Sequence, residues 1–190
     1  MKHLYILVIL VLGFVSCNTS PKVIIETSLG DIGCELYDDK APITVSNFLR
    51  YVDEQRYDNA AFYRVVAMDN QPNSDVKIEV IQGGLYDDDH ILMLPPIMHE
   101  TTMETGIQHL DGTISMARLE PGSASSEFFI CINDQPELDF GGKRNPDGQG
   151  FAAFGRVVSG MDVVRQIQLL RSAGQMLDDR LIIRSIKRIQ

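Results

Sequence analysis

Short runs of β-branched and aromatic residues, each bounded by Gly, Pro, Asn or Asp, recur along this sequence and constrain its fold more than any other feature. Runs of this kind are typical of β-strands. Apolar residues at helical spacing interrupt them at only two places, 41–55 and 159–170. Many short strands with two separated helices predict an antiparallel barrel closed on itself, with helices at its ends, rather than a β-α-β series. The strand-like runs are 22–28, 31–37, 61–66, 77–85, 112–117, 127–132 and 151–158.

The last segment of the chain, 179–190, allows two interpretations. Its isoleucines at 182, 186 and 189 follow helical spacing, yet the segment is also rich enough in isoleucine to form a strand. Periodicity alone leaves the choice open.

The N-terminal segment predicts export. A short basic start precedes an uninterrupted apolar run from Leu4 to Val15, which is too short to span a bilayer comfortably but suits a signal peptide. The ending "FVSC" resembles the cleavage box of bacterial lipoproteins, in which the cysteine, here Cys17, is acylated and becomes the new N-terminus. The alternative is an ordinary signal peptide cut near Ser16, with Cys17 incidental.

The predicted organisation has three parts. Residues 1–16 are a signal peptide, residues 17–21 are a lipidated N-terminus with a short tether, and residues 22–190 are one domain. Removing 16 of the 190 residues leaves 174, a length that suits one domain with a sizeable core. Acyl chains on Cys17 would anchor this domain to a membrane of the bacterial cell envelope, facing the periplasm or the cell surface.

The charge balance argues against nucleic acid as a partner. The formal net charge is −9 at pH 7, and it becomes −10 when Lys2 leaves with the signal peptide. The longest basic cluster, 184–188, suits a solvated strand face, so the sequence predicts no basic patch for nucleic acid or anionic lipid.

Other sequence patterns favour neither a redox nor a metal site. Cys34 and Cys131 lie in apolar runs and are predicted to be buried free thiols, although an oxidising compartment would also allow them to pair. The acidic run 87–89 with His90 lacks the ligand spacing of a calcium loop. The segment 140–150 lacks the spacing of a phosphate loop and is predicted to be a flexible glycine-rich turn. We expect no cofactor and no metal.

Four segments together resemble a known family. They are "FYRVV", "VIQGG", "HLDGTISMARLEPGSASSEFFICI" and "FAAFGRVVSGMDVVRQI". Their order and texture are similar to those of the cyclophilin family of peptidyl-prolyl cis-trans isomerases, from about Lys22 to Ile189. The resemblance implies a mainly β fold, namely a closed eight-stranded antiparallel β-barrel capped by two α-helices, with a substrate groove on one outer face. It also favours a strand for 179–190.

Arg64, at the centre of "FYRVV", is implied to be the catalytic residue. Rotation about an X–Pro amide meets a barrier of about 18–20 kcal/mol, because the C–N bond loses its double-bond character. A donor to the prolyl nitrogen stabilises its lone pair most in the twisted state, and arginine, always charged and rich in donors, suits this task. The segment alone also allows an arginine that snorkels to a rim or pairs with a buried acid.

The resemblance implies further roles around the groove. Gln82 is implied to hold substrate backbone, and the segment "SMAR" to bind the residue before proline through its own backbone. Apolar members are implied to form the proline pocket, with Phe129 as its floor. The implied substrate-binding residues are Gln82, Ala117, Arg118, Glu127, Phe129, Leu138 and Phe151.

Three acidic residues depart from the family's pattern. Glu79 stands where the family usually has a pocket phenylalanine, Glu127 replaces a glutamine near the catalytic arginine, and Glu137 replaces a tryptophan that often borders the groove. We expect Glu79 to remove part of the pocket wall, and Glu127 to form a charge-assisted bond with Arg64 that holds or diverts it. These departures predict weak or altered isomerase activity.

Two hypotheses for function therefore stand. The first is a monomeric, lipid-anchored isomerase that accelerates X–Pro isomerisation in exported proteins and so takes proline-containing polypeptides as partners. The second is a non-catalytic module that binds proline-containing segments in the same groove, weakened by Glu79, Glu127 and Glu137.

Overall fold

The structure is a computed structural model, and it describes residues 20–87 and 90–189. The predicted signal peptide and the predicted lipidation site at Cys17 lie outside the described residues. Within the described part, no helix is long and apolar enough to cross a membrane.

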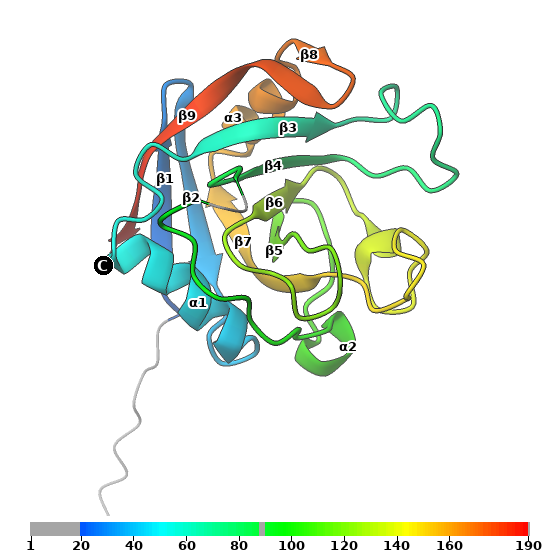
Figure 1. The fold of residues 1–190 in the computed structure, drawn as a ribbon, viewed down its shortest axis with the longest axis horizontal. Coiled ribbons are helices and arrows are strands. Elements are labelled where there is room, and N and C mark those ends of the chain that lie inside the picture. Colours follow the sequence, from blue (N-terminus) through cyan, green and yellow to red (C-terminus); the bar gives the residue numbers. More distant parts are fainter. Residues whose placement is uncertain (1–19, 88–89, 190) are drawn as a thin grey trace, which may run out of the picture.

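Eight antiparallel strands close into a barrel (Figure 1). The order around it is β1-β2-β7-β5-β6-β4-β3-β9, and β9 also pairs with β1, which joins the two edges of the sheet. The predicted eight-stranded antiparallel barrel is confirmed. A ninth strand, β8, adds a short hairpin to β9 outside the ring. The strands are β1 (Lys22–Thr27), β2 (Gly30–Leu36), β3 (Ala61–Val66), β4 (Val80–Gly84), β5 (Thr113–Met116), β6 (Phe128–Cys131), β7 (Ala152–Ser159), β8 (Ser172–Ala173) and β9 (Met176–Ile189).

Both predicted helices are present. α1 (Pro42–Asp53) begins with proline at its first turn and buries Val45, Phe48, Leu49 and Val52, while α3 (Met161–Gln168) buries Val163, Val164 and Ile167. In Figure 1, α1 and α3 lie in different parts of the barrel's periphery, α1 at the lower left and α3 behind β3 and β9. Two short elements were not predicted from the sequence, namely α2 (Thr102–Thr105) and the 3₁₀ turn η1 (Pro136–Leu138).

The ambiguous C-terminal segment is a strand. β9 pairs with β1 on one side and with β3 on the other, so backbone hydrogen bonds join it to strands on both sides. Ile183 and Ile186 are buried in the barrel core, whereas Ile182 is 46% exposed. The helical spacing of the isoleucines was therefore coincidental.

Aromatic rings fill the barrel interior beneath α1. Phe128 of β6 is fully buried and meets Phe48, Tyr57 and Phe62 edge-on, with ring centroids 5.5, 5.7 and 5.8 Å away. Edge-to-face contacts of this kind add to the free energy of burial. Phe128 thereby links the first helix to two strands of the barrel.

The two thiols of the barrel are buried and unpaired. Cys34 lies in β2 and Cys131 in β6, and both are free, as predicted. Burial raises the pKa of the Cys34 thiol to about 12. Neither thiol is positioned for nucleophilic chemistry, since the thiolate is the reactive form.

We expect Phe128→Ala to destabilise the fold strongly. Removing a fully buried aromatic ring loses its transfer free energy and leaves a cavity, which together cost about 3–5 kcal/mol. The free energy of unfolding in urea measures this. Ile91→Ala removes an apolar side chain that is 92% exposed and should change stability by less than about 0.5 kcal/mol. Equal effects of the two substitutions would contradict the assignment of the core.

Candidate functional site

A cavity of about 580 Å³ opens on the outer face of the barrel. Its volume lies within the range of about 300–1,000 Å³ that is usual for ligand sites. Residues from β3, β4 and β6 line it, together with the loops 85–101, 117–127 and 136–151. It brings together every groove residue that the sequence predicted: Arg64, Gln82, Ala117, Arg118, Glu127, Phe129, Leu138 and Phe151.

The floor of the cavity is apolar. Phe129 of β6 meets Phe151 edge-on at 5.3 Å, and Leu138 of η1 packs in the same cluster. The Phe151 N–H donates to the Leu138 carbonyl, which holds the two walls together. This cluster is separate from the barrel core, and most of its members line the cavity.

A buried histidine supports this floor from below. The His109 ring stacks on Phe129 with centroids 5.9 Å apart. Its Nδ1 lies 2.7 Å from an Asp139 oxygen and its Nε2 lies 2.9 Å from the Ser115 hydroxyl, so both nitrogens have partners. The two hydrogen bonds fix the ring plane and with it the position of Phe129. This role of His109 was not predicted from the sequence.

A β-bulge places Arg64 at the cavity. In the pairing of β3 with β4, Phe62 faces Gly83 and Arg64 faces Gln82, so Tyr63 is an additional residue on β3. The pairing of β3 with β9 also breaks between Phe62 and Arg64, but there the partner on β9 changes from Leu181 to Met176. A bulge interrupts the alternation of side chains and can re-aim one of them. Here both Tyr63 and Arg64 reach the side chain of Gln82.

Neutral amides hold the Arg64 guanidinium. Gln175 Oε1 accepts from Nε at 3.1 Å and from Nη2 at 2.6 Å, and Gln82 Oε1 accepts from Nη1 at 2.8 Å. Within residues 20–87 and 90–189, Arg64 makes no ion pair. Three of its five N–H groups are engaged, which leaves two for a ligand in the cavity. Burial, and then the charge of Arg144, lower its pKa, but an arginine remains charged at neutral pH.

The predicted bond between Glu127 and Arg64 does not form. The Glu127 carboxylate instead accepts from the Tyr63 hydroxyl, and also from the Tyr86 N–H and the Ser126 hydroxyl at 3.0 Å each. Gln82 Nε2 donates to the Tyr63 oxygen at 2.7 Å, so Glu127 contacts Arg64 only through two intervening side chains.

A glycine explains the position of the Glu127 carboxylate. Gly84 at the end of β4 has a φ of +149°, and a Cβ there would overlap the Glu127 carboxylate. The carboxylate therefore lies against the strand end, away from Arg64. Burial, and then the Glu127 charge, raise the pKa of Tyr63, so the phenol stays protonated and continues to donate.

The other two acidic departures, unlike Glu127, lie outside the cavity. Glu79 accepts from the Asn133 side chain at 2.9 Å, and the pocket wall at this place consists of Ile78 and Val80. The expected loss of wall at Glu79 is thus wrong, because the chain presents its neighbours instead. Glu137 accepts from the Lys143 N–H at 2.8 Å and stabilises the following loop.

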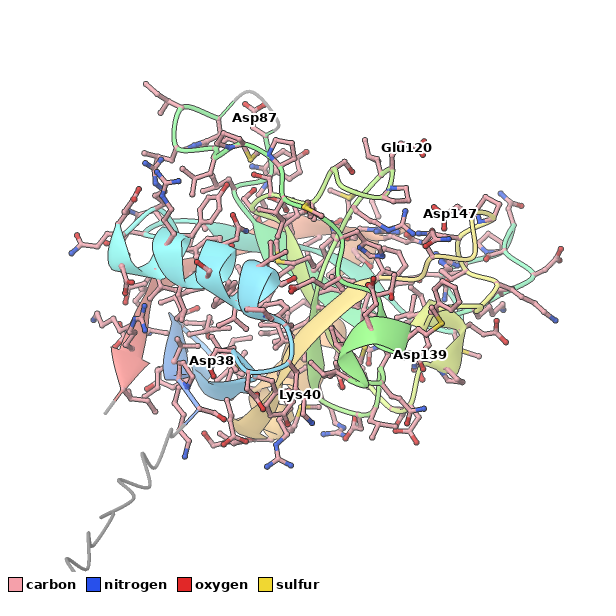
Figure 2. All side chains as sticks on the ribbon, turned by 90° about the horizontal axis from the view of Figure 1, so that it is seen from below. Asp38, Lys40, Asp87, Glu120, Asp139 and Asp147 are labelled. Carbon is pink, nitrogen blue, oxygen red and sulfur yellow. The ribbon has the colours of Figure 1, made fainter. Side chains whose placement is uncertain are left out.

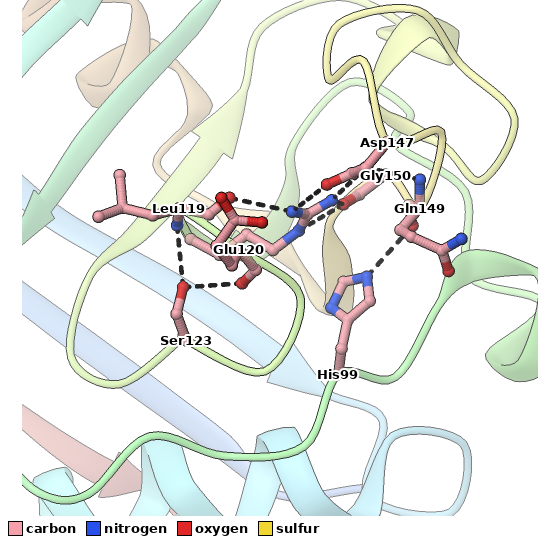
Figure 3. Close-up of polar contacts among 8 residues, drawn as sticks. His99, Leu119, Glu120, Ser123, Asp147, Gln149 and Gly150 are labelled. Atoms are coloured by element: carbon pink, nitrogen blue, oxygen red, sulfur yellow. Dashed lines mark hydrogen bonds and ion pairs between the residues drawn. The ribbon is translucent and has the colours of Figure 1, made fainter.

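Arg118 fixes that loop against the cavity. Its Nη1 and Nη2 bind the two Asp147 oxygens at 2.7 and 2.9 Å, and its Nε and Nη2 donate to the Gly150 carbonyl. The guanidinium also lies 5.3 Å over the Phe151 ring. Figure 3 shows Asp147, Gln149 and Gly150 gathered on one side of this network, with His99 below. The segment 140–150 is therefore a tethered wall and not the flexible turn that the sequence predicted.

The loops around the cavity lie along one edge of the molecule. In Figure 2, Asp87, Glu120 and Asp147 stand along the upper edge, while Asp38 and Lys40, next to α1, stand at the opposite edge. Asp88 and Asp89 of the acidic run lie outside the described residues. Within 20–87 and 90–189, no three His, Cys, Asp or Glu side chains gather closely enough to hold a metal ion.

Comparison with known proteins identifies the family. The family model described as cyclophilin type peptidyl-prolyl cis-trans isomerase matches residues 22–188. The chain belongs to the cyclophilins. It is 37% identical over 160 residues to peptidyl-prolyl cis-trans isomerase A of Dickeya dadantii (strain 3937), covering 83% of this chain and 76% of that protein. It is 38% identical over 154 residues to peptidyl-prolyl cis-trans isomerase B of Escherichia coli (strain K12), covering 77% and 83%.

A solved structure supports the same fold. A crystal structure of a cyclophilin type peptidyl-prolyl cis-trans isomerase from Cryptosporidium parvum superposes with a TM-score of 0.71 at 21% identity. The match covers 90% of this chain and 98% of that one. Cyclophilins catalyse the isomerisation of peptidyl-prolyl bonds, so the sequence-based assignment to an isomerase family is confirmed.

Two residues that position Arg64 were not found from the sequence of this cyclophilin. From the sequence, Tyr63 is one residue of a strand with alternating side chains. The bulge in β3 turns it toward the cavity. Gln175 lies in the turn between β8 and β9, more than a hundred residues from Arg64 along the chain. No local pattern in the sequence links this glutamine to "FYRVV".

Asp147 should stabilise the cavity wall in a pH-dependent way. Hydrogen bonds, first from Arg118 and then from the Gln149 N–H, lower the pKa of Asp147 from 3.8 to about 2. A carboxyl whose pKa is lowered by folding adds stability above its unfolded pKa and loses it as the pH falls through the folded value. Asp147→Asn should therefore lower the unfolding midpoint most above about pH 4, and the difference should vanish toward about pH 2.

Thermal unfolding of both proteins from pH 2 to 7 measures this effect. Asp75→Asn, in the exposed part of the loop 67–79, is the matched control and should give no such pH-dependent difference. A difference between wild type and Asp147→Asn that stays constant down to pH 2 would contradict the role of the Arg118 pair.

Proposed function

We propose that this cyclophilin accelerates X–Pro isomerisation in exported proteins, with Arg64 donating to the prolyl nitrogen. The observation that carries the proposal is the Arg64 guanidinium, held by Gln82 and Gln175 without an acidic partner beside the apolar floor. Two N–H groups remain unengaged by residues 20–87 and 90–189, so donors are available to a bound peptide.

The apolar floor is suited to a proline ring. Phe129, Leu138 and Phe151 offer an aromatic and aliphatic surface in a concave site, and burying the ring there excludes water from the amide. An electrostatic contact in such a site is stronger than in water. The ring therefore anchors the bond about which rotation occurs.

Backbone groups beside the floor can hold the residue before proline. The N–H and C=O of Arg118 have no hydrogen-bond partner in the described part of the chain, and Ala117, its neighbour, lines the cavity. A peptide held on one side of the bond and anchored by its ring on the other can twist only about the X–Pro amide.

Arg64 acts on the twisted state more than on the planar one. In the planar amide the nitrogen lone pair is delocalised and accepts poorly, whereas in the twisted state it is localised and accepts a charged donor well. An interaction that strengthens on the way to the transition state accelerates the reaction. The Gln82 amide fixes one edge of the guanidinium and Gln175 another, so little reorganisation is needed.

Localisation forms part of the proposal. The basic start, the apolar run from Leu4 to Val15 and the "FVSC" ending support an exported protein anchored through acylated Cys17 in the cell envelope. Uncatalysed X–Pro isomerisation takes tens of seconds or more, long enough for an exported chain to aggregate. We propose that the protein is a monomer and that such exported chains are its substrates.

Arg64→Ala should lower kcat/KM for an Ala-Pro peptide by about 100- to 1,000-fold, the usual effect of removing one preorganised donor. A proline-isomerisation assay measures the rate. Arg64→Lys keeps the charge but lacks the forked guanidinium that binds Gln82 and Gln175 together. Its kcat/KM should therefore lie between those of wild type and Arg64→Ala. Arg156→Gln removes an arginine outside the cavity and should match wild type. Peptide binding without Arg64-dependent acceleration would favour the non-catalytic module instead.

Cys17→Ser should release the protein from membranes. Without the acylated cysteine, no lipid anchor holds the domain, so the protein should move from the membrane fraction to the soluble exported fraction. Mass spectrometry of the wild-type N-terminus should show acyl chains on Cys17. A variant that stays in the membrane fraction after salt washing, although mass spectrometry shows that its signal peptide has been removed, would contradict the anchor.

A further inference from the structure

The cavity has two chemically different ends, which the strand register defines. Across β4 and β6, Gln82 faces Phe129 in the middle, Gly83 faces Phe128 toward one end, and Val80 faces Cys131 toward the other. Glu127 follows the first end, and the loop 67–79 precedes the second. Val80 and Gly84 are four steps apart along β4, so the ends lie about 13 Å apart along the strands.

Arg144 stands at the second end. Its Nη1 donates to Gln71 Oε1 at 3.1 Å, to the Ser74 hydroxyl at 2.8 Å and to the Val76 carbonyl at 2.6 Å, all in the loop 67–79. In Figure 1 this loop and the loop after η1 project from the same side of the barrel, at the right. These partners are neutral, and Arg144 forms no ion pair with any residue of 20–87 and 90–189.

The charge of Arg144 is therefore not balanced by an acidic partner, and neither is that of Arg64, which lines the same cavity. Burial, and then the Arg144 charge, lower the pKa of Arg64. Two guanidiniums that line one cavity and lack acidic partners favour an anion between or beside them.

Asn145 adds a donor at the same place. Its Nδ2 is buried and has no hydrogen-bond partner in the described part of the chain, and Asn145, like Arg144, lines the cavity. A buried donor without a partner costs free energy, which a ligand acceptor would recover. Arginine and asparagine together offer the donors that a carboxylate accepts.

The first end has the opposite charge. Glu127 lies there and forms no ion pair in the described structure, and its backbone carbonyl accepts from the Ala117 N–H at 2.8 Å. Ala117 and Arg118 are the residues that we propose to bind the residue before proline. With the residue before proline at Ala117 and Arg118, an acidic residue in that position would meet a like charge, and the residue after proline would extend toward Arg144.

We propose that Arg144 and Asn145 form a subsite for a carboxylate side chain directly after proline, so that the groove prefers X-Pro-Asp and X-Pro-Glu sequences. This inference rests on the proposed isomerase function and adds a substrate class to it. The net charge of −9 opposes acidic peptides at long range, but it is largely screened beyond about 8–10 Å at physiological salt. The local cations therefore decide the preference.

The test compares three peptides, Ala-Ala-Pro-Glu, Ala-Ala-Pro-Gln and Ala-Ala-Pro-Lys, each acetylated and amidated. For wild type, kcat/KM should be about three- to tenfold higher for the glutamate than for the glutamine peptide, and lowest for lysine. The preference should shrink as salt is raised. A glutamine peptide with a free C-terminal carboxylate shows whether a chain end binds in place of the side chain.

Variants separate charge recognition from loop structure. Arg144→Gln should bring the glutamate-to-glutamine ratio close to one, and so should Asn145→Asp, which places a carboxylate beside Arg144 without changing the size of the side chain. Arg156→Gln, which removes the same charge outside the cavity, should leave the ratio as in wild type. A substitution that merely loosened the loop would lower the rate for all three peptides and leave their ratio unchanged.

Binding constants from peptide titrations provide a second readout that does not depend on catalysis. Equal rates and equal affinities of wild type for the three peptides would overturn the inference while leaving the isomerase function intact. If no peptide is isomerised but the glutamate peptide binds more tightly and loses this advantage in Arg144→Gln, the proposed function fails and the subsite stands.

Discussion

The pairing of β3 with its neighbours admits one residue more on β3 than on β4, and the active face of the barrel depends on that mismatch. Without the additional Tyr63, strict alternation would place successive side chains of β3 on opposite faces of the sheet. With it, Tyr63 and Arg64 both reach Gln82 on the outer face, and Phe62 remains in the core. A barrel strand can thus carry a charged side chain in an apolar run because its backbone, not its composition, decides which way that side chain points.

The partners of Arg64 explain how a half-buried guanidinium retains its reactivity. A carboxylate partner would satisfy the guanidinium more strongly, but it would also neutralise the charge that a localised lone pair requires. Gln82 and Gln175 supply acceptors without a counter-charge. The side chains of Tyr63 and Gln82 lie between the Glu127 carboxylate and Arg64. The glutamate in "SSEFF" is accommodated because Gly84 has no Cβ at the strand end where the carboxylate lies.

Much of the fold follows from the sequence because it depends on local patterns. Strand-like runs with flanking turn residues located β1 to β7, and apolar spacing located α1 and α3. The C-terminal strand needed the family resemblance, because its isoleucines also fit a helix. α2 was visible in principle, since Thr101 and Glu104 form a capping box with the spacing that marks a helix start.

The residues that line the site could be predicted from the sequence, but the contacts among them could not. All eight groove residues line one cavity, because the family's motifs preserve their positions. The contacts among them depend on features that the sequence does not display, namely the bulge at Tyr63, the long-range approach of Gln175 and the tethering of the loop by Asp147. Glu79 and Glu127 were misjudged for the same reason: alignment to a motif fixes a position along the chain, not the direction of its side chain.

The wall that carries Arg144 is attached to the barrel through side chains and loop carbonyls, and no strand of the barrel pairs with it. The length and charge of this loop can therefore change in evolution while the pairing of the barrel strands stays the same. In the function that we propose, the loop that would contact the residue after proline is therefore structurally separate from the strand that carries Arg64, so substrate preference can change without a change in that strand.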